Sequence, residues 1–190
     1  MKSSLPPRIE SLRVADSAAH RTIHFLARKR VPLGFLTAVV AAILASPTWE
    51  SWRAGLLVAA VGEAIRIWAA GHLEKGSEVT RSGPYRWTAH PLYVGSSVLA
   101  LGVVIAAHSV VAFVLALIYM VSTLTAAVRT EEAFLRGRFG GAYDAYRRSE
   151  GEGMERRFSV ARAWRNKEYR AVIGILIGFA FLALRVARPI

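Results

Sequence analysis

The sequence predicts an all-α integral membrane protein, a polytopic bundle of about five transmembrane helices. Two observations predict this class: 54% of the 190 residues are hydrophobic, and long stretches without charge alternate with short, strongly basic ones. The apolar fraction alone would not distinguish a membrane protein from a soluble domain, whereas the alternation does. The length suits one membrane domain, residues 31–190, preceded by a basic amino-terminal segment, residues 1–30.

The composition argues against several classes of function. The formal net charge is +12, but the basic residues flank apolar runs instead of forming one face of a soluble domain, so nucleic acid is not expected as a partner. The absence of cysteine excludes disulfides, zinc–thiolate sites and a thiol nucleophile. No short apolar stretch with a small-residue cleavage site precedes the first apolar run near Val31, so a cleavable signal peptide is not expected.

The amino-terminal segment has a helical pattern of its own. After Pro6 and Pro7, apolar residues recur at three- and four-residue steps from Ile9 to Leu26, with arginines off that stripe. This spacing predicts an amphipathic helix that lies on an anionic lipid surface. The alternative interpretation is a mobile basic tail.

Two predicted spans follow, at about residues 31–48 and 54–72, with tryptophans at interface depth between them. The second span contains Glu63 and Arg66, which are three residues apart and therefore share a helix face. Ionisable groups at membrane depth need a partner or a polar cavity. The two residues therefore form either a structural ion pair or part of a site.

The next apolar stretch must contain two helices. Residues 92–128 include no charged side chain over 37 positions. As one helix they would extend about 55 Å at 1.5 Å per residue, against a hydrocarbon core of about 30 Å. We therefore expect a tight helical hairpin of the third and fourth spans, with its turn near residues 106–109. A fifth run, residues 171–186, either spans the membrane or lies against the bundle.

The distribution of basic residues predicts the orientation. Three segments, residues 1–30, 74–91 and 129–170, hold 21 of the 25 lysines and arginines. The positive-inside rule places these segments, and the amino terminus, in the cytosol. The alanine- and arginine-rich composition hints at a bacterial source, and hence at the bacterial inner membrane.

The first motif is GPYRWTAHPLYVG, residues 83–95, where a loop enters the third span. Its Gly-Pro pair fixes a bend, and His90 is disfavoured from the α region because it precedes proline. Pro91 suits a first helical turn. His90, Tyr93 and the free amide groups of this turn should therefore gather at the cytosolic mouth of the bundle. A lone histidine there could also be an interfacial anchor.

The second motif is EEAFLRGRFGGAYDAY, residues 131–146, where the fourth span leaves the membrane. The helix should continue to Phe139 and stop at the following glycines. Because the predicted hairpin returns the chain to the side of residue 90, Glu131 and Glu132 should lie near the first motif. Without such a neighbour, the two carboxylates would be only a solvated helix end.

Together the two motifs resemble the isoprenylcysteine carboxyl methyltransferase and phospholipid methyltransferase superfamily of membrane enzymes. Its usual pattern is GPY-x-x-x-RHP-x-Y-x-G, then, after a helical hairpin, EE-x-x-L-x-x-x-FG-x-x-Y-x-x-Y. The order and spacing agree from about Gly71 to Tyr146. Either block alone would be a weak signal, whereas the pair is fairly specific. Two departures are Ala89, where the family commonly has arginine, and the lack of a proline-containing ending after the second tyrosine.

The resemblance implies a methyltransferase whose cofactor, S-adenosylmethionine, is held at the cytosolic ends of the helices. The cofactor-binding positions that it implies are His90, Pro91, Tyr93, Gly95, Glu131 and Glu132. It implies catalytic roles for His90 and Glu131 and a lipid or other amphiphilic acceptor. A carboxylate acceptor needs no general base, whereas an amine acceptor needs one, for which His90 or a glutamate is the candidate.

Two other functions remain open from the sequence. One is an NADPH-dependent membrane reductase of the sterol-reductase kind, which has a similar core. The other is a non-catalytic membrane binding protein, an idea to which Ala89 gives some support. Neither the chemical nature of the acceptor nor the oligomeric state can be read from the residues.

The orientation is testable because the chain has no cysteine of its own. We expect single cysteines introduced into residues 1–30 or 129–170 to be labelled by a membrane-impermeant thiol reagent only after the cells are opened. A cysteine at Arg53, on the opposite side, should be labelled in intact cells. Labelling of both basic segments in intact cells would contradict the predicted orientation.

Overall fold

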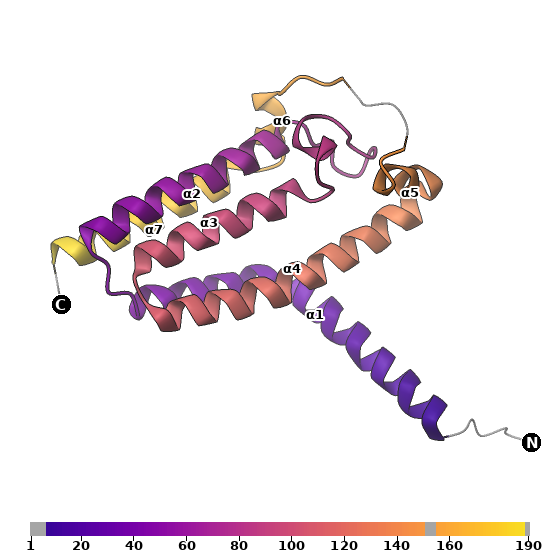
Figure 1. Cartoon of the computed structure of the whole chain (residues 1–190), viewed down its shortest axis with the longest axis horizontal. Helices are drawn as coiled ribbons and strands as arrows, with labels where there is room; N and C mark the ends of the chain where they lie inside the picture. Colours follow the sequence, from indigo (N-terminus) through magenta and orange to yellow (C-terminus); the bar gives the residue numbers. More distant parts are fainter. Residues whose placement is uncertain (1–6, 151–154, 189–190) are drawn as a thin grey trace, which may run out of the picture.

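The computed structural model describes the backbone of residues 7–150 and 155–188, and the side chains from Arg21 onward within these ranges, His24 excepted. This part of the chain is helical and contains no strand (Figure 1). The elements are α1 (Pro7–Ile43), α2 (Trp49–Ala70), the 3₁₀ helix η1 (Gly83–Arg86), α3 (Pro91–Ala107), α4 (Val110–Phe139), α5 (Gly141–Arg147), α6 (Val160–Arg165) and α7 (Tyr169–Ala187).

The long helices form two groups. In one group α2 packs along α3, and α7 lies against both of them. In the other group α1 packs along α4. The short elements η1, α5 and α6 gather at one end of the molecule, beside the carboxyl ends of α2 and α4 (Figure 1). This end holds both of the sequence motifs.

Glycines bring α2 and α3 into direct backbone contact. Gly55 and Gly62 on α2 face Gly102 and Gly95 on α3. A Cβ added to Gly62 would lie 2.3 Å from the backbone nitrogen of Leu99, far inside van der Waals contact. Such small residues allow membrane helices to approach closely and gain dispersion energy that lipid cannot replace.

At the opposite end, where the turns lie, a cluster of small residues joins the two groups. The backbone amide of Ser46 donates a hydrogen bond of 2.9 Å to the carbonyl of Ala107, linking the end of α1 to the end of α3. The buried members of this cluster are Ala41, Ala45, Ala59, Ala106, Ala107, Ala112, Phe179 and Leu182. The core is therefore built mainly from alanines, whose small side chains let the helices approach closely.

The turn between α3 and α4 lies where the sequence predicts it. His108 adopts the left-handed conformation (φ 49°) that ends a helix, and the Ser109 side chain accepts a hydrogen bond from the amide of Ala112 to begin the next. The two helices nevertheless have different main partners, because α3 packs chiefly on α2 and α4 chiefly on α1. As predicted, α4 continues to Phe139, and Gly140 ends it with a φ of 50°.

The amino-terminal half of α1 differs from the prediction. We expected an amphipathic helix in residues 1–30 and a separate span from residue 31, but residues 7–43 form one helix. Pro32 lies inside it, and α1 changes direction part way along (Figure 1), as expected where proline removes a backbone hydrogen bond. The apolar stripe that predicted a surface helix lies largely among side chains outside the described set.

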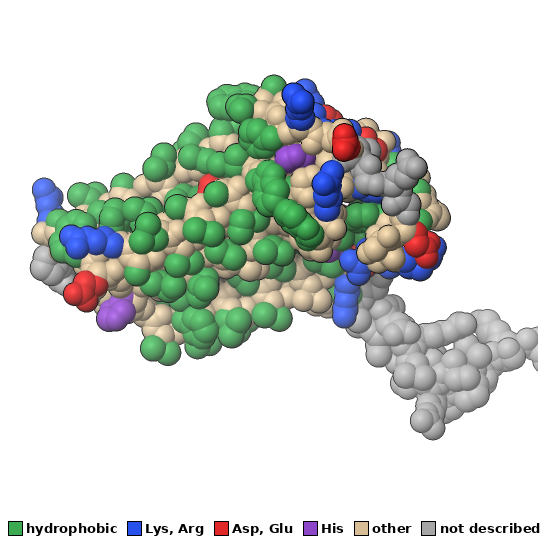
Figure 2. All heavy atoms as spheres, turned by 45° about the horizontal axis from the view of Figure 1, so that its top comes forward, with side chains coloured by type: hydrophobic (Ala, Val, Ile, Leu, Met, Phe, Trp, Pro, Cys, Tyr) green, Lys and Arg blue, Asp and Glu red, His purple; other side chains and the backbone are tan. Residues whose placement is uncertain are grey.

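Large apolar side chains cover the outside of the bundle. Phe35 is 71% exposed, Val110 80% and Ile177 66%. Figure 2 shows hydrophobic side chains over the middle of the molecule and most charged ones towards its ends. Among the described helices, α4 and α7 are long and apolar enough to cross a membrane, and α3 is a shorter apolar helix. Apolar faces of this extent favour lipid as their surroundings.

The packing of α2 on α3 can be tested with two glycine-to-alanine changes. We expect Gly62→Ala to destabilise the protein by about 1–3 kcal/mol, because backbone atoms must move to admit the methyl group. Gly137 on α4 has open space around it, so Gly137→Ala should be neutral or stabilising by up to about 1 kcal/mol. Thermal unfolding in detergent measures both, and equal stability of the two variants would contradict this account of the interface.

Candidate functional site

The start of α3 presents two stacked rings. His90 precedes the helix with φ −131° and ψ 53°, outside the α region, as expected for a residue before proline. Its imidazole stacks on the ring of Tyr93, with centroids 5.6 Å apart and planes 27° from parallel. Pro91 is fully buried beneath this pair and fixes the first turn. The stacked rings are partly exposed, so one face of the pair can meet a ligand.

Two carboxylates from α4 face these rings. Oε1 of Glu132 lies 3.3 Å from Nε2 of His90, and Oε2 of Glu131 lies 3.9 Å from Nδ1. The Tyr93 hydroxyl lies near the Glu131 carboxylate and near the Arg30 guanidinium on α1. The structure therefore brings His90 and Tyr93 next to Glu131 and Glu132, although about 40 residues separate the two pairs in the sequence.

The two carboxylates have different surroundings. The Glu132 side chain is only 17% exposed, and it faces Arg136 at 3.6 Å and Arg147 at 3.5 Å in addition to His90. The Glu131 side chain is 43% exposed, and its distance from His90 is too long for a hydrogen bond. Glu132 is therefore held by cations within the protein, whereas Glu131 keeps free capacity to accept hydrogen bonds.

Tyr146 on α5 fixes the loop that carries His90. Its hydroxyl donates to the carbonyl of Tyr85 at 2.7 Å and to that of Thr88 at 3.3 Å. Burial raises the pKa of Tyr146 to about 12, so this hydroxyl stays a donor at neutral pH. Arg81 strengthens the same link by donating to the carbonyl of Ala142.

The segment from residue 155 to 168 caps the carboxyl end of α2. The Asn166 amide donates to the carbonyls of Ala70 and Leu73, at 2.8 and 2.9 Å, and Arg162 donates to the carbonyl of Gly71. These groups satisfy carbonyls that a helix end leaves without partners. Arg162 also pairs with Glu74 at 2.7 Å and holds the pKa of that carboxyl below its usual range. The loop before η1 is thus anchored at its start.

The charged pair on α2 is part of a network that joins three helices. Arg66 pairs with Glu63 at 3.3 Å, with Glu168 just before α7, and with the hydroxyl of Ser96 on α3. Glu63 and Glu168 are both buried. The contacts support the structural ion pair, and Arg66 also lines an apolar cavity between the helices.

Two of the predicted cofactor-binding residues have packing roles. Gly95 lies against α2, where an added Cβ would come within 2.7 Å of the Gly62 carbonyl oxygen. Pro91 is buried at the helix start. Arg30, Arg147 and Glu168 were not predicted as partners of these residues. Only Arg147 has a local signal in the sequence, because it directly follows the second motif.

Comparison with known protein families bears on the same region. Residues 59–142 match the family model described as phospholipid methyltransferase. This match confirms the resemblance seen in the two motifs: it covers all of the first block and the second block up to residue 142. No curated protein and no solved structure matches the chain.

The loop anchor can be tested with two tyrosine-to-phenylalanine changes. We expect Tyr146→Phe to destabilise the protein by about 1–2 kcal/mol, because two partly buried carbonyls lose the hydroxyl that they share. Tyr143 is a matched control, because its buried hydroxyl has no hydrogen-bond partner among the described residues, so Tyr143→Phe should be neutral or stabilising. Thermal unfolding measures both variants, and the reverse order of stability would contradict the assignment.

Proposed function

We propose that this chain, whose residues 59–142 match the phospholipid methyltransferase family, is an integral membrane methyltransferase that uses S-adenosylmethionine. Its acceptor is a lipid or another amphiphile. The observation that carries the proposal is the meeting of His90 and Tyr93 with Glu131 and Glu132 at one end of the bundle. These residues come from the two blocks that the resemblance assigns to one cofactor site.

The residues present fit this cofactor chemically. The free oxygens of Glu131 can accept hydrogen bonds from ribose hydroxyls or from the charged amino group. The stacked rings of His90 and Tyr93 offer an aromatic face to positive charge. When bound, S-adenosylmethionine supplies an electrophilic methyl group on a positively charged sulfur.

Methyl transfer is an in-line displacement, so the main task of the protein is to align the two reactants and exclude water. Tyr146, Arg81 and Asn166 perform the alignment indirectly by anchoring both ends of the loop that carries His90. For an amine acceptor, His90 or Glu131 takes up the proton that the nitrogen loses. For a carboxylate acceptor, neither residue needs to act as a base.

We place the site at the cytosolic surface of a membrane, with the apolar part of α1 and helices α2, α3, α4 and α7 as the five spans. The exposed apolar side chains of α1, α4 and α7 support this arrangement. The basic segments at the site end favour a cytosolic location there and contact with anionic lipid headgroups. On this proposal the amino terminus is cytosolic and the membrane is the inner membrane of a bacterium.

Ligand binding separates this proposal from a reductase. We expect S-adenosylmethionine or S-adenosylhomocysteine to raise the unfolding temperature of the purified protein, and NADPH to leave it unchanged, because only a ligand of the folded state stabilises it. Thermal unfolding with each ligand at millimolar concentration is the measurement. A shift with NADPH alone would favour the reductase, and no shift with any of the three would favour a non-catalytic protein.

The two carboxylates should differ in their effect on cofactor affinity. We expect Glu131→Gln to cost about 1.5–3 kcal/mol of binding if its charge accepts hydrogen bonds from the cofactor, or roughly ten- to a hundredfold in affinity. Glu132→Gln should cost less, because arginines and His90 already occupy that carboxylate. Calorimetry with S-adenosylhomocysteine on the detergent-solubilised variants gives both values. Wild-type affinity after neutralising both glutamates would show that the site is elsewhere.

A further inference from the structure

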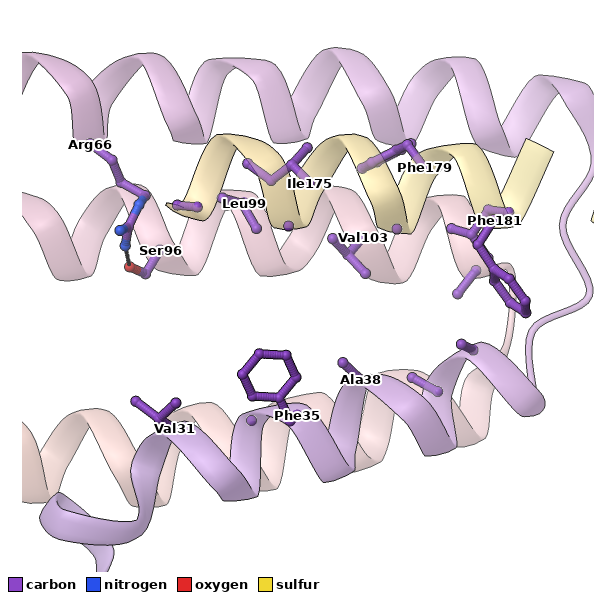
Figure 3. Close-up of a pocket in the computed structure, with 18 residues that line it drawn as sticks. Val31, Phe35, Ala38, Arg66, Ser96, Leu99, Val103, Ile175, Phe179 and Phe181 are labelled. Carbon is purple, nitrogen blue, oxygen red and sulfur yellow. Dashed lines mark hydrogen bonds between the residues drawn. The ribbon is translucent and has the colours of Figure 1, made fainter. Parts of the chain in front are cut away.

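An apolar cavity of about 490 Å³ separates the two groups of helices. Its walls come from α1 on one side and from α3 and α7 on the other (Figure 3). Phe35, Leu99, Val103 and Ile175 are among the side chains that line it. The volume lies within the range of about 300–1,000 Å³ that proteins use to enclose small ligands. The exposed Val31 and Phe35 form part of its rim, so the cavity is open to the surroundings of the bundle.

The glycines of α7 that line this cavity do not serve helix packing. A Cβ added to Gly174 or Gly178 would meet nothing within 4 Å. Gly62 on α2 is the contrasting case, since its added Cβ would meet backbone at 2.3 Å. Protein interiors are close-packed, so an open space of this size between helices has room for a ligand. The small residues of α7 leave room for a ligand instead of bringing another helix close.

The polar groups of the cavity lie at one end, on the side of the candidate site. Figure 3 shows Arg66 and Ser96 at one end and Phe181 at the other. Ser96 follows Tyr93 by three residues on α3, which is a rise of about 4.5 Å on the same helix face. On α1, Val31 lines the cavity and directly follows Arg30, whose guanidinium lies near Tyr93. On both walls the polar end of the cavity therefore lies within about one helical turn of the residues at the candidate site.

We propose that this cavity binds one hydrocarbon chain of the methyl acceptor, with the reactive head at His90 and Tyr93 and the tail running towards Phe181. The inference rests on the proposed methyltransferase function and adds the site of the acceptor. A single chain suits the volume and the apolar lining, and the polar end fits the junction between tail and head. Any second chain stays in the surrounding bilayer.

The walls of the cavity lie partly outside the region that matches the family. The cofactor residues lie within residues 59–142, the region that matches the methyltransferase family. The α1 wall (residues 31–42) and the α7 wall (residues 171–182) both lie outside that region. On this proposal α1 and α7 contribute to binding of the hydrocarbon chain from outside the matched region, whereas Leu99 and Val103 of α3 line the same cavity from within it.

The test uses three probes that carry the same photoreactive diazirine near the end of one acyl chain. One is a phosphatidylethanolamine with an acceptor amine, one is a fatty acid with an acceptor carboxylate, and one is a phosphatidylcholine with neither. Each is incorporated at low abundance into phosphatidylcholine nanodiscs that contain the full chain. After illumination, mass spectrometry of peptides locates the adducts.

We expect the amine or the carboxylate probe to label the cavity residues of α1 and α7 several-fold more than the choline probe. Gly178→Leu and Gly174→Leu each place a bulky side chain in the cavity at a position where the added Cβ meets no atom within 4 Å, and both should strongly reduce these adducts. Leu176→Phe is the matched control, because Leu176 lies on the same helix but is exposed and does not line the cavity. Its adducts should equal those of the wild type.

Equal labelling by all three probes would mean that bulk lipid fills the cavity, and would overturn the proposal, as would the absence of cavity adducts. Adducts that remain at the wild-type level in both glycine variants would overturn it as well. Affinity for S-adenosylhomocysteine is measured in parallel and should stay within about twofold in Gly178→Leu, because the change is remote from the cofactor residues. If the wild type does not bind S-adenosylhomocysteine, the proposed methyltransferase function is refuted. This result is distinct from a failure of the photolabelling alone.

Discussion

The guanidinium of Arg66 determines how α2, α3 and α7 are held relative to one another. It pairs with Glu63 on its own helix, with Glu168 before α7, and with Ser96 on α3. An ion pair broken inside an apolar bundle leaves an uncompensated charge, which costs about 3–5 kcal/mol. None of the three helices can therefore shift without a large penalty. The same group lies at the polar end of the cavity beside α7.

The site at the start of α3 depends on this arrangement and on two further anchors. The glycine contacts fix the position of α3 along α2. The hydrogen bonds of Tyr146 and Asn166 fix the path of the loop that leads to His90. Glu132 is then neutralised by Arg136 and Arg147, while Glu131 remains available. Rigid support around a partly exposed carboxylate is the arrangement that orients a ligand by hydrogen bonds, which is what a displacement reaction requires.

The sequence predicted the parts of the site that depend on local pattern. A charge-free stretch too long for one helix implied a reversal of the chain, and that reversal brings Glu131 back to His90. It could not predict Glu168 as a partner of Arg66, because the two are about a hundred residues apart and only the docking of α7 joins them. The continuous α1 was not predicted because the basic residues up to Arg30 and the apolar run from Val31 indicated two separate helices, whereas one helix continues through Pro32 with a change of direction. The cavity beside Gly178 was equally unpredictable, since a glycine in an apolar helix usually indicates close packing.

The central claim is that the two sequence blocks line one cofactor pocket, and a double-mutant cycle tests it most directly. Calorimetric titration with S-adenosylhomocysteine would be run on the wild type, His90→Ala, Glu131→Gln and the double variant. If both residues contact one ligand, their effects on binding should be non-additive by at least about 0.5 kcal/mol. Additive effects within about 0.3 kcal/mol, or no effect of either change on affinity, would contradict the account.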